Sequence, residues 1–138
     1  MNKNLKIVII LVILGLSSVL VKQLFFNDPA FKKVMLEAAF ELNQNCPIMV
    51  DKETRLDNAN VITNDTFQYN YTLVNLEHSS VNISEMENFL EPMIVNLVRT
   101  NPELEIYREN KITMAYNYKD RNGQFLLRIL VTPDKYID

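Results

Sequence analysis

Glycine, cysteine, histidine and tryptophan are scarce in this sequence of 138 residues, which has two glycines, one cysteine, one histidine and no tryptophan. A glycine-rich phosphate-binding loop needs several glycines close together, and Gly15 and Gly123 lie far apart. A zinc site of cysteine and histidine needs more ligands than Cys46 and His78 supply. One cysteine also excludes a disulfide within the chain. The sequence therefore predicts no catalytic residue, no metal site and no cofactor.

Charge is absent from the amino-terminal run Ile7–Val21, which Lys6 and Lys22 flank. A helix over residues 5–24 would extend about 30 Å, the thickness of the hydrocarbon layer of a bilayer. The lysine stems at its ends can lie along lipid while their ammonium groups reach water. We therefore expect residues 1–26 to form a cytoplasmic stub and a transmembrane signal anchor, followed by a single domain over residues 27–138.

A cleaved signal peptide is the alternative interpretation of the same segment. Such a peptide needs small residues at its cleavage site, and the small residues of Gly15-Leu16-Ser17 lie inside the apolar run. No Ala-x-Ala site is present, and no cysteine suitable for lipidation follows the run. These observations favour an anchor that is retained.

The distribution of lysines bears on the orientation of the anchor. Lys3 and Lys6 favour a cytoplasmic amino terminus, whereas Lys22, Lys32 and Lys33 on the other side weaken that preference. A short stub before a large carboxy-terminal domain is typical of a domain that is exported. The predicted location is the cell membrane, with a single pass and a periplasmic domain.

The predicted domain has too few basic residues for nucleic-acid binding. Without the three lysines of residues 1–26, 11 basic residues stand against 17 acidic ones, a net charge of about −6. Binding to phosphate groups requires a basic face. The expected partners are the membrane, through residues 5–26, and another membrane or envelope protein.

Two helices are predicted in the domain. The first spans residues 28–45 and begins with an N-cap and a proline. The second spans residues 84–107, begins with a capping box of Ser84 and Glu87, and stops and restarts at Asn101-Pro102. Each helix carries an apolar stripe at helical spacing, which predicts that one side of it packs on a core.

A hairpin follows each predicted helix. Asn122-Gly123 favours a type I′ turn, and counting outward from it pairs Tyr118 with Leu127, Tyr116 with Ile129, Met114 with Val131, Asn117 with Arg128 and Lys119 with Leu126. The same count around Asn64-Asp65 pairs Ile62 with Phe67, Asn60 with Tyr69, Asn58 with Tyr71 and Leu56 with Leu73.

Both hairpins contain the tripeptide Tyr-Asn-Tyr, at residues 69–71 and 116–118. An aromatic ladder that binds a ligand is one explanation of these tyrosines. However, side chains alternate along a strand, so both tyrosines of each copy must point to one face and the asparagine to the other. This alternation favours tyrosines on the core face of a sheet, with their hydroxyl groups either near the sheet margins or within reach of buried amides such as Asn58 and Asn60.

The segment "VDKETRLDN" contains the one cluster that suggests a site. Asp51, Glu53, Arg55 and Asp57 occupy every second position, so an extended strand would project all four from one face. Such a face can hold a cation or a cationic partner, or it can be a solvated surface with an internal ion pair. A helix–loop–helix calcium site is excluded, because its glycine and its twelfth-position glutamate are missing.

The stretches "CPIMVDKETRLDNA", "FQYNYTLVN", "MAYNYKDRNGQF" and "ILVTP" resemble a group of small bacterial exported or membrane-anchored proteins that have no established activity. The likeness extends over about Cys46–Pro133. It implies further cysteines after the second helix and at the carboxy terminus, where this chain has Thr100 and the residues 136–138. The resemblance supports a bacterial envelope location and supplies no catalytic residue.

Taken together, the patterns predict an α+β fold in which a transmembrane helix precedes a four-stranded antiparallel sheet of two hairpins. The helices pack on this sheet, and the order of elements is α-β-β-α-β-β. The predicted function is that of a non-catalytic, membrane-tethered interaction module or an accessory subunit of an envelope assembly. An immunity or inhibitor protein is one alternative, and a small hydrolase that uses the carboxylates of Asp51, Glu53 or Asp57 is another.

Overall fold

The structure is a computed structural model that describes residues 31–138. The predicted stub, the predicted transmembrane helix and the first residues of the predicted helix 28–45 lie outside the described residues. Within residues 31–138, no helix has both the length and the apolar character needed to cross a membrane.

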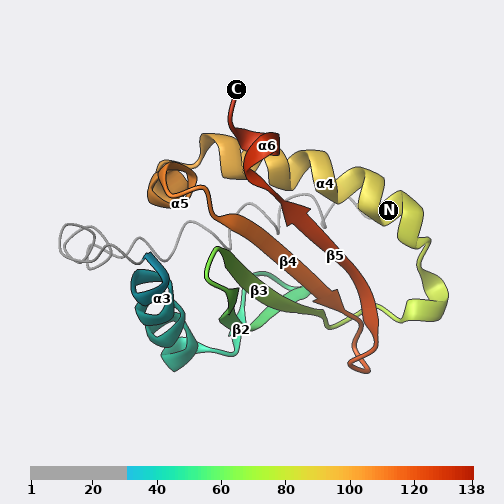
Figure 1. The fold of residues 1–138 in the computed structure, drawn as a ribbon. Helices are drawn as coiled ribbons and strands as arrows, with labels where there is room; N and C mark the ends of the chain where they lie inside the picture. The colour runs from blue at the N-terminus through green and yellow to red at the C-terminus, as the bar shows by residue number, and fades with distance from the viewer. Residues whose placement is uncertain (1–30) are drawn as a thin grey trace.

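The described elements follow one another as shown in Figure 1. They are helix α3 (Phe31–Asn45), strands β1 (Ile48–Met49), β2 (Thr54–Thr63) and β3 (Thr66–Leu73), the 3-10 helix η2 (His78–Ser80), helix α4 (Ile83–Thr100), the 3-10 helix η3 (Pro102–Leu104), helix α5 (Glu105–Glu109), strands β4 (Thr113–Lys119) and β5 (Phe125–Val131), and helix α6 (Pro133–Tyr136).

The sheet differs from the predicted four-stranded antiparallel one. It has five strands in the order β1-β2-β3-β4-β5, and β3 pairs with β4 in parallel while the other pairs are antiparallel. The parallel pair arises because α4, with 18 residues, is long enough to carry the chain back along the sheet, so β4 starts at the same end as β3. The fifth strand is the short β1, which pairs Ile48 with Leu56 and Met49 with Arg55.

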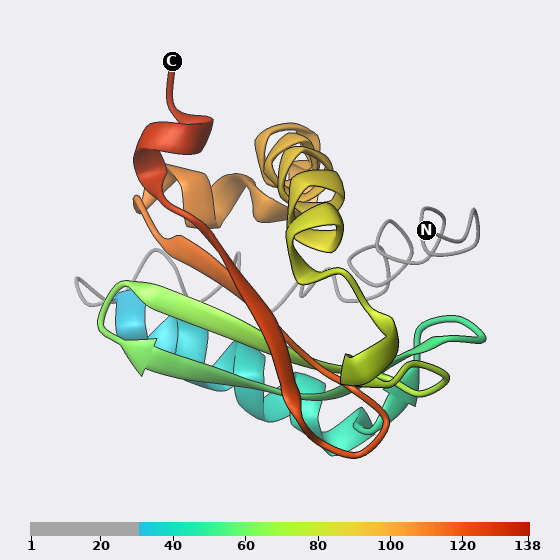
Figure 2. The ribbon, with the colours of Figure 1, turned by 90° about the vertical axis from the view of Figure 1, so that its right-hand side faces the viewer.

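The helices depart from the prediction at their ends. The N-cap of α4 is Asn82, whose side chain accepts a hydrogen bond from the Glu85 backbone N–H at 3.1 Å, so the predicted capping box of Ser84 and Glu87 is wrong. The predicted interruption at Asn101-Pro102 is confirmed, because α4 ends there and η3 and α5 follow as separate turns. Helix α3 lies beside β2, and α4 runs along the β5 side of the sheet (Figures 1 and 2).

The second hairpin has the predicted register over most of its length. Tyr118 pairs with Leu127, Tyr116 with Ile129, Met114 with Val131 and Asn117 with Arg128. Lys119 pairs with Phe125 instead of Leu126, because a register shift follows Tyr118. The turn is not of type I′, which needs two residues with positive φ. Within this turn only Gly123 has a positive φ, of 81°. The Gly123 N–H donates a hydrogen bond to the Asp120 carbonyl at 3.0 Å.

The first hairpin has a different register from the predicted one. Two irregularities, between Val61 and Thr63 and between Leu56 and Asn58, shift β2 against β3. The observed partners are Val61 with Phe67, Ala59 with Tyr69, Leu56 with Tyr71 and Thr54 with Leu73. The shift buries Ala59 and leaves Asn58 and Asn60 exposed, so these two amides do not accompany the tyrosine hydroxyl groups as expected. The burial of apolar side chains therefore decides the register of β2 and β3, and the register predicted by counting residues outward from the turn is not adopted.

The tyrosines form the centre of the core, as expected for the inward face of a sheet. All six are buried. Because β3 and β4 are parallel and in register, Tyr69 stacks on Tyr116 with ring centroids 5.5 Å apart, and Tyr71 stacks on Tyr118 at 5.3 Å. Buried residues of α3 and α4 complete the same cluster: Met35, Ala39, Leu42, Met86, Leu90, Ile94 and Val98.

Candidate functional site

The predicted acidic cluster does not form one face. Asp51 and Glu53 precede β2, and the Asp51 Oδ1 atom accepts hydrogen bonds from the backbone N–H groups of Glu53 at 2.7 Å and Thr54 at 2.8 Å. This carboxylate therefore stabilises the turn into β2. Because the turn is not an extended strand, the alternation that would have aligned Asp51 with Arg55 and Asp57 is absent.

Arg55 and Asp57 do lie together. The Arg55 Nε atom donates to Asp57 Oδ1 at 2.6 Å, and the Thr72 hydroxyl donates to Asp57 Oδ2 at 2.5 Å. Both carboxylate oxygens of Asp57 thus have a partner within the sheet. Among residues 31–138, no group of three or more histidine, cysteine or carboxylate side chains is placed to hold a metal ion.

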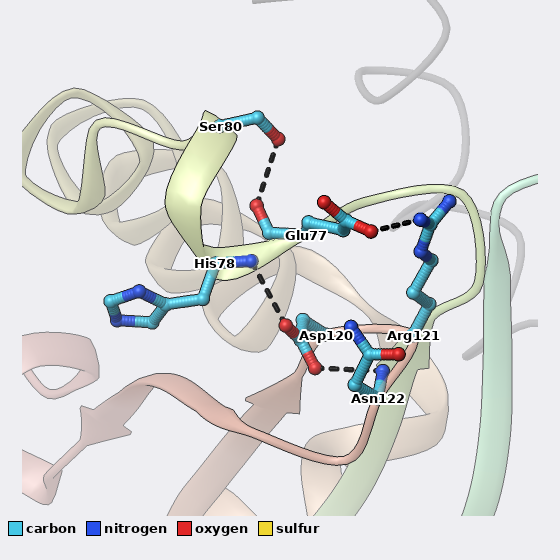
Figure 3. A network of polar contacts seen from close by, with 6 residues as sticks. All are labelled: Glu77, His78, Ser80, Asp120, Arg121 and Asn122. Atoms are coloured by element: carbon cyan, nitrogen blue, oxygen red, sulfur yellow. Dashed lines mark hydrogen bonds and ion pairs between the residues drawn. The ribbon is translucent and has the colours of Figure 1, made fainter.

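Cys46 follows α3 and His78 lies in η2, and no hydrogen bond among the described residues joins them as a nucleophile and its base. Burial, followed by the charge of Asp57, raises the pKa of the half-buried Cys46 thiol, which keeps it protonated and unreactive at neutral pH. His78 lies in η2, and its ring points away from the neighbouring polar groups (Figure 3). The Ser80 hydroxyl donates to the Glu77 carbonyl at 2.8 Å and does not face the ring.

A polar network fastens the β4–β5 turn to the segment that leads into α4 (Figure 3). The buried Asp120 accepts a hydrogen bond from the His78 backbone N–H at 2.9 Å through Oδ2, and from the Asn122 and Gln124 N–H groups at 2.8 Å through Oδ1. These backbone donors, His78 first, lower the pKa of Asp120. Glu77 and Arg121 add an ion pair, so the arrangement is a structural link between two loops.

The outer face of the sheet is a row of carboxamides. Strand register places Asn58 beside Asn70, Asn70 beside Asn117, and Asn117 beside Arg128. The Asn70 Nδ2 group donates to Asn58 Oδ1 at 2.7 Å and to Asn60 Oδ1 at 2.9 Å. This face is polar, as expected for the side of the sheet opposite the tyrosines.

The backbone groups at the two edges of the sheet have different hydrogen-bond partners. Along β2, the pairing with β1 covers Leu56. The Asn43 carboxamide, from α3, then acts like a further strand residue: its Nδ2 group donates to the Ala59 carbonyl and its Oδ1 accepts from the Ala59 N–H, both at 2.7 Å. Along β5, Lys135 Nζ from α6 reaches the Leu130 carbonyl at 3.0 Å.

The structural roles of three residues, Asp120, Asn43 and Lys135, were not predicted from the sequence. Asp120 had a usable signal, because an aspartate before Asn122-Gly123 is typical of a turn that its side chain closes. Asn43 and Lys135 had none, because each acts on a strand edge that only the tertiary structure defines.

Comparison with known proteins assigns a family. A family model described as a domain of unknown function, DUF8479, matches residues 30–127, so the chain belongs to that family. Comparison with curated protein sequences gave no match.

Three solved structures of bacterial proteins are similar in fold to this chain. The chain is similar to PA3611 of Pseudomonas aeruginosa, provisionally described as a secreted protein, with a TM-score of 0.63, 10% identity, and coverage of 76% of this chain and 91% of that one. It is similar to the type 2 secretion system pilotin EpsS of Vibrio vulnificus (TM-score 0.60, 8% identity, coverage 78% and 93%). It is also similar to the type II secretion system pilotin AspS of Vibrio cholerae (TM-score 0.57, 14% identity, coverage 76% and 91%).

Proposed function

We propose that this member of the DUF8479 family is an accessory subunit of an envelope assembly, which acts by binding another envelope protein. The observation that carries the proposal is the fold shared with two type II secretion pilotins over more than nine-tenths of each pilotin chain. At identities of 8% and 14% the likeness supports a common architecture. The role of a pilotin-like subunit is the inference that we add to it.

The chemistry of the candidate clusters supports binding over hydrolysis. The Oδ1 atom of Asp51 holds a turn and both carboxylate oxygens of Asp57 hold a strand pair, whereas a general base needs a carboxylate that is free to reach a substrate. Asp120 is likewise occupied by three backbone N–H groups. The outer face of the sheet and its edges are among the surfaces that remain available for binding.

We also propose that the domain is extracytoplasmic and tethered by residues 5–26. The apolar run with flanking lysines supports the tether. The fold shared with a protein described as secreted and with two secretion-system pilotins supports the location. A carboxy-terminal alkaline phosphatase fusion tests the location, because the phosphatase is active only outside the cytoplasm. A fluorescent cytoplasmic reporter with an inactive phosphatase would reverse the topology.

Photo-crosslinking in native membranes tests the accessory-subunit proposal. A crosslinking amino acid is placed in the full chain at exposed positions on different surfaces, one per variant, and adducts are identified by mass spectrometry. We expect one envelope protein to recur from neighbouring positions. A matched variant with alanine at Asp51, Glu53 and Asp57 should still capture that partner. Loss of function in this variant with the partner still captured would favour a hydrolase, and the absence of a recurrent partner would contradict the proposal.

A further inference from the structure

Strand β5 ends the sheet with backbone groups that point away from it. The Thr113 N–H of β4 bonds to the Asp65 carbonyl on the β3 side at 2.8 Å, so alternation along β4 turns Met114, Tyr116 and Tyr118 towards β5. Their register partners Leu127, Ile129 and Val131 face β4 in return. Arg128 and Leu130, the residues between these partners, therefore direct their N–H and C=O groups outward.

A second observation confirms this direction. The Leu130 carbonyl accepts the hydrogen bond from Lys135 Nζ, which a carbonyl engaged in the sheet and facing β4 would not be placed to do. No described residue outside the strands bonds to the other three groups, the N–H and C=O of Arg128 and the N–H of Leu130. We call these three groups the β5 edge. They are the unpaired backbone positions that an added strand would use.

The side chains around the β5 edge are suited to a partner. Arg128 is exposed and has no ion pair within the described chain, where Arg55, Arg121 and Lys135 have one each. Phe125 is 54% exposed and Leu130 is 39% exposed, although both are large and apolar. The positive charge of Arg128 therefore lies between the exposed apolar side chains of Phe125 and Leu130 along β5.

We infer that the β5 edge binds an extended segment of the partner protein as an added antiparallel strand, with an acidic side chain opposite Arg128. This inference rests on the proposed function and specifies its partner. Because both backbone groups of Arg128 are available, one partner residue can exchange two hydrogen bonds with it and must lie directly opposite. A carboxylate at that place neutralises Arg128, and an apolar residue two positions along the partner strand lies opposite Leu130.

A second copy of this chain fits the edge less well. The register that pairs the whole strand sets Leu126 of each copy opposite Leu130 of the other, and it brings Arg128 opposite Arg128. Like charges directly opposite each other destabilise a strand pair. The opposite edge is closed to an added strand at Leu56 and Ala59 by β1 and Asn43.

Two peptides test the inference on the full chain in detergent micelles. Both have nine residues of alternating valine and threonine, and they carry aspartate or lysine at the centre. We expect the aspartate peptide to bind about five- to tenfold more tightly than the lysine peptide by fluorescence anisotropy. We also expect it to shift the backbone amide NMR signals of Arg128 and Leu130. Arg128→Glu should reverse the preference, while Lys33→Glu, the same charge change on α3, should leave it unchanged.

The outcomes separate this inference from the proposed function. Equal affinity for both peptides, or amide shifts along β2 instead of β5, would overturn the inference. So would a dimer through β5 in the absence of peptide, detected by sedimentation. In the crosslinking experiment, a partner captured at other positions but not at Arg128 would retain the accessory subunit and reject the β5 edge. Capture of no partner from any position would reject both.

Discussion

The two hairpins carry the same tripeptide, yet only β4–β5 keeps the register expected from its turn. In β4–β5, four predicted pairs occur as counted. In β2–β3, the pairing shifts twice within ten residues of β2. Tyrosines nevertheless point inward in both hairpins, so the alternation of side chains was the stronger signal and the turn the weaker one.

The turns explain part of this difference. The turn after β4 is fixed by the left-handed Gly123 and by the buried Asp120 side chain, which holds two turn N–H groups. The turn after β2 relies on exposed contacts, such as Thr63 Oγ1 to Asp65 Oδ1 at 2.6 Å. In β2, Asn58, Ala59 and Asn60 also leave one apolar residue between two polar ones, and the bulges bring that residue to the core.

Alkaline pH should have the largest effect on the shared tyrosine core. Burial raises the pKa of Tyr69, Tyr71, Tyr116 and Tyr118 in the folded state, whereas tyrosines in the unfolded chain ionise near pH 10. The raised pKa values stabilise the fold fully below about pH 10, and this contribution is lost as pH rises towards the folded values. We expect stability in urea titrations to be steady from pH 7 to 9 and to fall steeply above pH 10. An unchanged midpoint at pH 11 would contradict the buried positions.

Single truncations in the two hairpins should cost nearly the same. Tyr71→Ala and Tyr116→Ala each remove a buried, stacked ring and should lower the free energy of unfolding by about 3–5 kcal/mol. Chemical denaturation of both variants measures this. A cost below about 1 kcal/mol in one hairpin alone would show that its tyrosine is not part of the common core.

Removing the side chain of Asn43, which covers the β2 edge, should give the next largest loss of stability. Asn43→Ala leaves both backbone groups of Ala59 without their partner, which should cost about 1–3 kcal/mol. Gln44→Ala is the matched control, because Gln44 is exposed and adjacent on α3. We expect hydrogen exchange at the Ala59 amide to accelerate in Asn43→Ala only. Equal exchange in both variants would mean that the edge is protected in another way.

The turns themselves can be compared by two alanine substitutions. Gly123 has φ of 81°, and an added Cβ would meet no atom within 4 Å, so Gly123→Ala should cost about 1–2 kcal/mol from backbone strain alone. Asn64 has no positive φ, and Asn64→Ala should change stability by less than about 0.5 kcal/mol. Thermal melts of both variants provide the measurement, and a larger cost at Asn64 would reverse the roles given to the turns.

Several local patterns in the sequence predicted the structure correctly, although the capping box and the type I′ turn did not. The alternation in Tyr-Asn-Tyr, the break at Asn101-Pro102 and most of the β4–β5 pairs depend on neighbours in the chain, and all of them are confirmed. The parallel pairing of β3 and β4 depends on how α4 crosses the sheet. The residues of two adjacent hairpins do not specify that direction, so the antiparallel sheet was the wrong inference.

The candidate site was less predictable than the fold. The spacing of Asp51, Glu53, Arg55 and Asp57 implied one continuous strand, but β2 begins at Thr54 and bulges after Leu56. The β5 edge has no sequence signature either, because Arg128 becomes an edge residue only when β5 is the last strand. The proposed binding at the β5 edge therefore depends on strand order, which is the part of the fold that the sequence left open.

The smallest expected effect distinguishes the asparagines at the centres of the two tripeptides. Asn70 donates to Asn58 and Asn60 and accepts from Gln68 Nε2 at 2.8 Å, so Asn70→Ala should cost up to about 1 kcal/mol. Asn117 has no side-chain hydrogen bond within residues 31–138 that would be lost, and Asn117→Ala should cost less than about 0.5 kcal/mol. Urea titrations at one pH resolve the pair, with Asn70→Ala combined with Asn58→Ala as a double-mutant cycle. A coupling free energy near zero would show that the carboxamides of the outer face do not stabilise the fold, which would leave them available to a ligand.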